Sequence, residues 1–331
     1  MISVIIPCYN AEQTVAATIS SALEQDVEKE IIVINDGSTD GSAKVISQFG
    51  HNVHTVTTPN RGASSARETG TSMARGAYIQ YLDSDDLLTR GTLAARLRAL
   101  DLHRADVAHT DWQKLEHRGN GSSVLGDIMR PDLSAIERDA EAAAATSDFW
   151  APPAALLYRR TIVDRIGGWH TGLPVIQDAR YLFEAARHQA RFVHVPEIGA
   201  YYKVHHGSLS RRNLKEFIAD CARNTTEIEA LWRGQGALSP SRVDALTRMW
   251  GHVVKAALLG GLDEFEKARA GYNRVAAHRS LFEAGYILRR AIGAKATSSV
   301  LQTALRSKQA FLKPMDMGVG RLPRRSDASV N

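Results

Sequence analysis

The chain has 331 residues, of which 44% are hydrophobic and 23% are charged, with a formal net charge of +5. This is the composition of a folded soluble protein long enough for two modest domains. No apolar run of about 18 residues occurs, and the N-terminus lacks the pattern of a secretory signal, so we expect a cytoplasmic protein without a membrane span. Cys8 and Cys221 lie far apart without a CxxC spacing, which argues against a disulfide framework or a zinc knuckle.

The first hundred residues alternate apolar runs with helical patterns. Asn10 is expected to cap the first helix, because Gln13 three residues later resembles a capping box. Small residues over 60–67 resemble a helix start that suits phosphate. The resulting βαβαβαβ order predicts a parallel sheet with right-handed crossovers and helices on both faces. The runs that read as buried strands are 3–6, 31–34, 53–56 and 78–82.

Polar residues follow these strands at their carboxyl ends, where open α/β sheets bind ligands. The densest group is Leu82-Asp83-Ser84-Asp85-Asp86, with three carboxylates in four residues. Their mutual repulsion favours a divalent cation that also holds substrate phosphate oxygens. A polar loop whose Asp residues cap a helix starting near Gly91 is the bland alternative. The four strand ends together favour a nucleotide-plus-metal site; their polar residues are Asn10, Asp36, Asn60 and Asp83 to Asp86.

The region from 101 to 213 is less regular. A strand is expected at 106–109, a turn at 118–123, an alanine-rich helix at 136–146 and a strand at 192–195. Trp150 suits either stacking on a sugar ring or, more commonly, core packing. Asp178 opens a helix over 179–187, where a helix N-terminal charge is the simple explanation. His205 and His206 lie in a Gly/Ser loop and on their own would be exposed polar residues.

Helical patterns continue from about Leu214 to Phe311, over 217–232, 241–259, 263–277 and 281–305. Residues 286–331 carry nine Lys or Arg and two Asp, a net of +7, so the rest of the chain sums to −2. This basicity attracts anionic partners, although a solvated helix face with a disordered end explains it as well. We expect four parts: 1–100 and 101–213 as the donor and acceptor halves of one domain, 214–312 as a helical region, and 313–331 as a disordered tail.

Over residues 1 to 212 the sequence resembles the inverting nucleotide-sugar glycosyltransferases of family two. The segments that carry the resemblance are Val4 to Asn10, Ile34 to Asp40, Asn60-Arg61-Gly62 with Ala66-Arg67, and Leu82 to Asp86. The resemblance implies a GT-A fold: an α/β, Rossmann-like, mostly parallel sheet with helices on both faces, here followed by a C-terminal α-helical region.

The resemblance also implies a donor site. Tyr9 would stack on the nucleobase, Asp36 would accept a base N–H, and Arg67 would fix the base or the diphosphate. Asp83 would contact the ribose, or the metal indirectly. The full set of implied donor residues is Pro7, Tyr9, Asn10, Asp36, Asn60, Gly62, Arg67, Asp83 and Ser84.

For the metal, the resemblance implies that Asp85 and His205 hold Mn²⁺ or Mg²⁺. Asp178 matches the family's catalytic base, with Gln177 where Glu is usual, which removes a neighbouring negative charge. Lys203 replaces a common Arg, so a phosphate contact there is no longer bidentate. Trp150, Gln177 and Lys203 are therefore candidates for acceptor or diphosphate contacts.

We expect a metal-dependent inverting transferase that moves a sugar from a UDP-sugar to a hydroxyl of a glycan or lipid-linked acceptor, in surface polysaccharide or glycoconjugate synthesis. A nucleotidyltransferase should carry a Gly-rich basic loop where this chain has Pro7 to Asn10. A non-catalytic nucleotide-sugar sensor or assembly subunit is the alternative. The C-terminal helices are a candidate cap or homo-oligomerisation element whose basic end rests on the inner face of the membrane; no nucleic-acid partner is expected.

Overall fold

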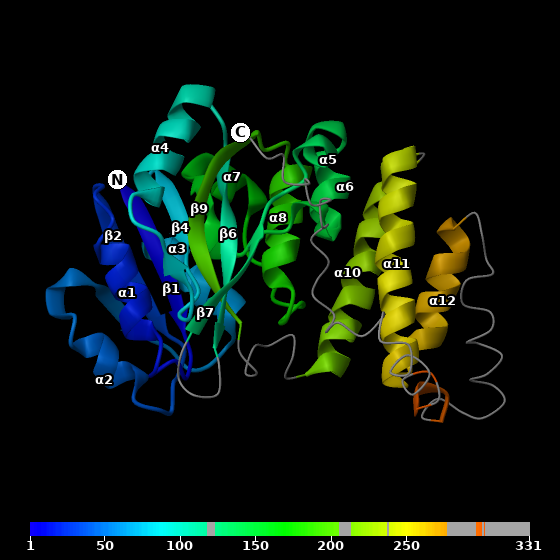
Figure 1. The fold of residues 1–331 in the computed structure, drawn as a ribbon, viewed down its shortest axis with the longest axis horizontal. Helices are drawn as coiled ribbons and strands as arrows, with labels where there is room; N and C mark the ends of the chain where they lie inside the picture. The colour runs from blue at the N-terminus through cyan, green and yellow to red at the C-terminus, as the bar shows by residue number, and fades with distance from the viewer. Residues whose placement is uncertain (118–122, 205–212, 237, 277–295, 300, 302–331) are drawn as a thin grey trace, which may run out of the picture.

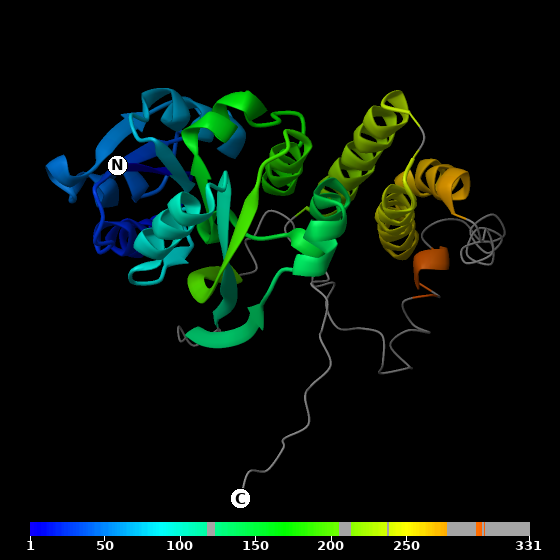
Figure 2. The same ribbon diagram turned by 90° about the horizontal axis from the view of Figure 1, so that it is seen from above.

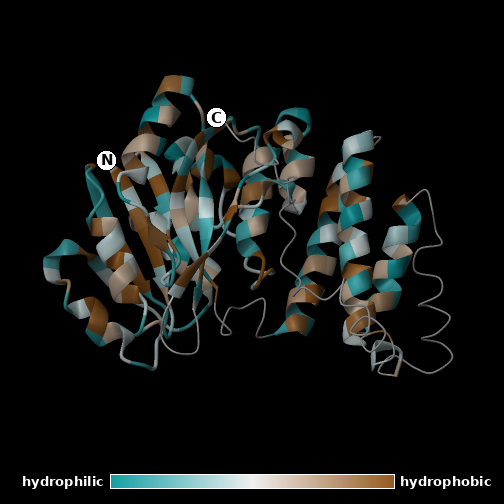
Figure 3. Ribbon diagram, in the orientation of Figure 1, coloured by the Kyte–Doolittle hydropathy of each residue, from teal (hydrophilic) through white to brown (hydrophobic). Residues whose placement is uncertain are grey.

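The computed structural model describes residues 1–117, 123–204, 213–236, 238–276, 296–299 and 301 (Figure 1). Within these residues, nine strands form one continuous sheet, and three long helices stand beside it (Figures 1 and 2). Hydrophobic residues concentrate in the central strands and on the inner sides of the helices (Figure 3). No helix in the described part of the chain is long and apolar enough to cross a bilayer.

The N-terminal half of the sheet is parallel, as the sequence predicts. The strands β3, β2, β1 and β4 lie side by side in that order. Because β1 and β2 are apolar and almost fully buried, helices can pack on both of their faces. The bounds are β1 Ile2–Cys8, β2 Lys29–Asn35, β3 His54–Thr57 and β4 Tyr78–Tyr81.

The second half of the sheet is mixed. Strand β8 lies between β4 and β6 and is antiparallel to both, while β9 runs parallel to β6. The short β5 pairs with β9, and β7 pairs with β6 across the turn expected at 118–123, most of which lies outside the described residues. The bounds are β5 Leu87–Leu88, β6 Val107–His117, β7 Ser123–Met129, β8 Leu156–Arg159 and β9 Phe192–Val204.

Helices cover both faces of the sheet. On one face, the segment just after α1 contacts α4, because the Gln25 side chain accepts from the Leu93 amide. On the other face, α3 packs so closely on β1 that a Cβ at Gly70 would meet Ile5 at 2.3 Å. The bounds are α1 Val15–Leu23, α2 Ser42–Ser47, η1 Gly50–Asn52, α3 Ala63–Met73, α4 Thr92–His103, α7 Arg160–Ile166 and α8 Gln177–Arg187.

Two expected helices differ in the structure. Asn10 does not cap α1, which begins at Val15 without a side-chain cap. Instead Asn10 adopts a left-handed conformation (φ +50°), and its side chain accepts from the Thr39 amide at 2.8 Å. The helix expected at 136–146 is split at Asp139, whose carboxylate caps the second piece. The pieces are α5 Leu133–Arg138 and α6 Ala140–Ala145, followed by the turns η2 Ser147–Phe149 and η3 Pro153–Ala155.

The helices expected at 217–232, 241–259 and 263–277 are confirmed. They form a group beside α8 (Figures 1 and 2) and enclose a hydrophobic cluster that includes Phe217, Trp250 and Phe265. The helix expected at 281–305 and the tail fall largely outside the described residues. The bounds are α10 Leu214–Gly234, α11 Pro240–Gly260 and α12 Glu264–Val275.

Candidate functional site

The loops that follow β1 and β2 are tied together at the carboxyl edge of the sheet. The Asn10 amide donates to Ser38 Oγ at 3.0 Å, alongside the contact from Asn10 to Thr39. Pro7 is buried at the end of β1, while the Tyr9 ring is 46% exposed. The loop pairing therefore holds an aromatic face toward solvent at the edge where the sequence predicts the nucleobase.

Asp36 organises the loop before α3. Its carboxylate accepts from the amides of Arg61 at 3.0 Å and Gly62 at 2.8 Å, and from Thr58 Oγ1 at 3.2 Å. Gly37 makes this close approach possible, because a Cβ there would lie 2.8 Å from the Asn60 nitrogen. Asn60 and Gly62 remain exposed at the tip. Asp36 thus has a structural task that the sequence did not indicate, in addition to its predicted contact with the base.

Arg67 is a buried cation with unused donors. One amino group forms an ion pair with Asp83, and the guanidinium lies 4.3 Å from the centroid of the Trp169 ring. Only 2% of Arg67 is exposed, and its Nε and Nη1 have no hydrogen-bond partner among the described residues. Because a buried guanidinium has five N–H donors that need hydrogen-bond acceptors, these unpaired N–H groups suit an anionic ligand.

The three carboxylates of the acidic stretch have different environments. Asp83 is the partner of Arg67, and Ser84 and Asp85 are half-buried. Asp86 is buried; its Oδ1 accepts from the Lys203 amide at 2.9 Å, and its Oδ2 has no partner within the described chain. Burial above all, and then the charges of Asp85 and Asp83, raise the pKa of Asp86.

The alternative in which this stretch caps the next helix is wrong. Helix α4 has Gly91 at its N-cap, and no side chain bonds there. The acidic residues are held at the sheet edge by other contacts: Thr18 Oγ1 donates to the Asp86 carbonyl at 2.9 Å, and β9 supplies the Lys203 amide.

Asp178 lies in the first turn of α8, as predicted, and is half-buried. Burial raises its pKa, the charge of Asp83 raises it further, and the charge of Arg67 counteracts the rise. Asp83 and Arg67, which both lie about a hundred positions before Asp178 in the sequence, thus act on its carboxylate through space. Gln177 beside it is buried, and its Oε1 has no partner among the described residues.

Aromatic side chains surround this meeting point. Trp150 is 8% exposed and packs edge-on against Trp112 and Tyr202, with ring centroids 5.3 and 5.7 Å apart, so it serves core packing. Trp169 stacks on the ring of Tyr181, with the ring centroids 4.1 Å apart. The Arg67 guanidinium also lies over the Trp169 ring. Sequence analysis assigned no role to Trp169. The sequence feature that could have drawn attention to it is the Gly167-Gly168 pair just before it, whose positive φ angles of 76° and 137° turn the chain toward α3.

A metal is implied by the resemblance. Among the described residues, no group of three or more His, Cys, Asp or Glu side chains is arranged to hold an ion by itself. His205 lies outside those residues. The carboxylates at 83, 85 and 86 fit a hard cation whose remaining ligands come from substrate phosphate, because they supply only oxygen ligands and the charges of Asp85 and Asp83 raise the pKa of Asp86.

Comparison with known proteins gives a match to a protein family. Residues 3–164 match the family model described as glycosyl transferase family 2. These residues, just under half of the chain, are similar to this family. An uncharacterized glycosyltransferase of Haemophilus influenzae is 35% identical over 137 residues, which are 40% of this chain and 55% of that protein. One of Rickettsia bellii is 36% identical over 137 residues, 39% of this chain and only 20% of that protein. The chain thus spans well under two thirds of these relatives.

A longer match is the Escherichia coli UDP-Glc:alpha-D-GlcNAc-diphosphoundecaprenol beta-1,3-glucosyltransferase WfaP, 27% identical over 66% of this chain and 83% of that protein. Among solved structures, Staphylococcus aureus TarS 1-349 in complex with UDP-GlcNAc has a TM-score of 0.57 at 18% identity, with 94% of this chain and 93% of that chain covered. The mannosyltransferase PcManGT of Pyrobaculum calidifontis in complex with GDP-Man and Mn²⁺ has a TM-score of 0.55 at 18% identity, covering 93% and 86%. These likenesses establish the GT-A fold.

Proposed function

We propose that this protein is a metal-dependent inverting glycosyltransferase that moves a sugar from a nucleoside diphosphate, with UDP favoured, to a hydroxyl of an acceptor. The observation that carries the proposal is the meeting of Asp178 with Asp83 and Arg67 at one edge of the sheet. A base and a diphosphate-binding group are the two parts that a single displacement at an anomeric carbon needs.

The donor would lie along the edge formed by the first four strands. The exposed Tyr9 ring would stack on the base, and Asp36 fixes the loop before α3 through the amides of Arg61 and Gly62. The free Nε and Nη1 groups of Arg67 would donate to the diphosphate. The proposal requires the anomeric carbon to face the first turn of α8, where Asp178 lies.

Asp85, with His205 as the expected second protein ligand, would hold a Mn²⁺ or Mg²⁺ ion. The ion, when bound, neutralises negative charge on the departing nucleoside diphosphate. Arg67 and Lys203 add positive charge from this chain's own residues, with Lys203 anchored to Asp86 through its amide.

Asp178 would act as the general base. Its carboxylate accepts the proton of the acceptor hydroxyl, the hydroxyl oxygen bonds to the anomeric carbon, and the bond from that carbon to the diphosphate oxygen breaks. Attack from the face opposite the leaving group inverts the configuration. The raised pKa of Asp178 strengthens its carboxylate as a base.

The names of the relatives support an acceptor class. WfaP and WfgD of Escherichia coli are named for transfer to GlcNAc-diphosphoundecaprenol. We therefore infer a glycan or lipid-linked acceptor, used in surface polysaccharide or glycoconjugate synthesis at the cytoplasmic face of a membrane. The basic segment 286–331, most of which lies outside the described residues, is the proposed contact with anionic lipid.

The test is release or transfer from a panel of nucleotide sugars by the purified full chain, with Mn²⁺, with Mg²⁺ and with EDTA, together with Asp85→Ala and Asp178→Asn. Nucleoside diphosphate release that requires metal and both carboxylates supports the proposal and names the donor. Metal-dependent nucleotide binding without turnover, unchanged in Asp178→Asn when acceptors are supplied, would instead support a non-catalytic nucleotide-sugar sensor.

A further inference from the structure

The segment between α7 and α8, residues 167–176, has little regular structure of its own. Its polar backbone groups are satisfied from two sides. On the donor side, Glu68 of α3 accepts from the Trp169 amide, and Ser64 Oγ donates to the His170 carbonyl at 3.5 Å. The segment therefore begins against the helix that carries Arg67.

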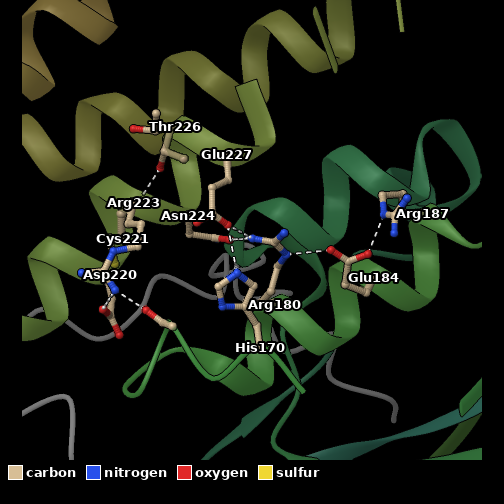
Figure 4. A network of polar contacts seen from close by, with 12 residues as sticks. His170, Arg180, Glu184, Arg187, Asp220, Cys221, Arg223, Asn224, Thr226 and Glu227 are labelled. Atoms are coloured by element: carbon tan, nitrogen blue, oxygen red, sulfur yellow. Dashed lines mark hydrogen bonds and ion pairs between the residues drawn. The ribbon is translucent and has the colours of Figure 1, made fainter. Parts of the chain in front are cut away.

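On the opposite side, α10 holds the same segment (Figure 4). Asp220, which is 1% exposed, accepts from the Val175 amide at 2.9 Å, and Arg223 donates to the Gly172 carbonyl. A buried backbone N–H without an acceptor is costly, so Asp220 determines where the chain enters α8.

Glu227 of α10 joins both ends of the segment. Its Oε2 lies 3.2 Å from His170 Nε2 and accepts from Arg180 Nη1 at 2.6 Å (Figure 4). Arg180 is mostly buried, lies two residues after Asp178, and also donates to Asn224 Oδ1 at 3.0 Å. The Glu227 carboxylate thus holds both His170, which follows Trp169, and Arg180 in the first turn of α8.

Apolar contacts also connect this segment to the C-terminal helices. Leu173 and Ile176 belong to the hydrophobic cluster of the C-terminal helices, together with Phe217 and Ile218 of α10. The entry to α8 is therefore packed into the core of the helical region and not into the core beneath the sheet. Moving α10 would move the turn that carries Asp178.

We propose that α10 is a positioning element of the active site, in which Glu227 and Asp220 set the place of Asp178 relative to Arg67. This assignment rests on the proposed function, because it takes Asp178 as the base. It gives the C-terminal helices a role in transfer itself, beyond that of a cap. Because a displacement of about 1 Å can reduce a rate by roughly a hundredfold, loss of Glu227 should lower turnover without a direct contact with substrate.

The experiment compares Glu227→Ala and Glu227→Gln with Glu229→Gln. Glu229 is the control: it is also a glutamate of α10 that bonds to arginine, and it is more deeply buried than the half-buried Glu227, but its partners Arg233, Trp250 and Arg274 all lie in the helical region. For each full-length variant we would measure the melting temperature, the Kd for UDP with Mn²⁺, and kcat and KM for transfer.

Glu227→Ala should lower kcat about tenfold or more while the Kd for UDP stays within about twofold. Glu227→Gln keeps acceptors for Arg180 and His170 and should restore part of the rate, while Glu229→Gln should keep kcat despite a similar fall in melting temperature. An unchanged kcat in Glu227→Ala, or equal losses of kcat in Glu227→Ala and Glu229→Gln, would overturn the assignment.

Hydrogen–deuterium exchange separates this inference from the proposed function. Faster exchange over 172–180 in Glu227→Ala, absent from Glu229→Gln, supports positioning even if the wild-type protein releases no nucleoside diphosphate. Lack of turnover by the wild type overturns the proposed function alone. Unchanged exchange in Glu227→Ala overturns the positioning role, whatever the wild-type activity.

Discussion

The backbone amide of Lys203 donates a 2.9 Å hydrogen bond to Oδ1 of Asp86, so the end of β9 is fixed to the acidic stretch that follows β4. The two residues come from opposite halves of the sheet. Asp86 is committed to this contact and Asp83 to its ion pair with Arg67, so the neighbouring carboxylates of the acidic stretch differ in their contacts.

Asp86→Asn should stabilise the protein above acidic pH. Burial and the neighbouring charges raise the pKa of Asp86, so the folded state disfavours its ionised form. The free energy of unfolding should therefore fall as pH rises from the unfolded Asp pKa of about 3.9 through the raised folded value. Asn keeps the acceptor for Lys203 without the charge. Melting temperatures measured in EDTA between pH 5 and 8 should favour the variant, most at pH 8; a lower value for the variant at pH 8 would contradict this account.

The pH dependence of transfer should reflect Asp178. Because burial and Asp83 raise its pKa, kcat/KM should decrease as pH falls through a value above the ordinary Asp pKa of about 3.9. Asp178→Asn should reduce kcat by about 10² to 10⁴ and leave the Kd for UDP with Mn²⁺ nearly unchanged. A variant that retains most of its kcat would exclude Asp178 as the base.

Tyr9 should contribute to nucleotide affinity and not to stability. Its ring is 46% exposed, so Tyr9→Ala removes little buried surface and should leave the melting temperature unchanged. Loss of stacking should raise the Kd for UDP about tenfold. Tyr9→Phe keeps the aromatic face and serves as the control. Calorimetric titration with UDP and Mn²⁺ measures both, and equal affinities of the Ala and Phe variants would contradict stacking.

Asp36 should affect stability and affinity together. Asp36→Ala leaves the amides of Arg61 and Gly62 without their acceptor and should lower the free energy of unfolding by about 2 kcal/mol. The loosened loop should also weaken nucleotide binding. Thr58→Val removes only the hydroxyl contact and should have a much smaller effect. Urea unfolding with parallel UDP titration would show whether the two losses occur together.

The parallel half of the sheet could be predicted from sequence because its signals are local. Each of β1, β2 and β4 is an apolar run, and the carboxyl ends of parallel strands share one edge, so the polar residues after them had to converge. Asn10 shows the limit of this reasoning. The pattern after it resembles a capping box, but its side chain bonds to Thr39, which is 29 positions away.

The mixed half of the sheet and its surroundings depend on long-range contacts that produce no local pattern in the sequence. Strand β9 was expected only at 192–195, yet it continues to Val204 after Pro196 and Glu197 bulge out of the pairing with β6. Pro196 has no N–H for the ladder, so the sequence indicates an end where the structure has an interruption. The contacts of Glu227 with His170 and Arg180 are equally invisible, because a polar residue on a helix is usually assigned to solvent.

Strand β8 hydrogen-bonds to β4 on one side and to β6 on the other, which joins the parallel and the mixed halves into one continuous sheet. This continuity disfavours closure of the two halves as separate lobes around a hinge. In the proposed function, the distance from the nucleotide to the base would be set when the chain folds, and adjustment to different donors and acceptors would be left to side chains and to the segments between strands. Changes of specificity in this protein should accordingly arise from loop exchange more readily than from altered domain motion.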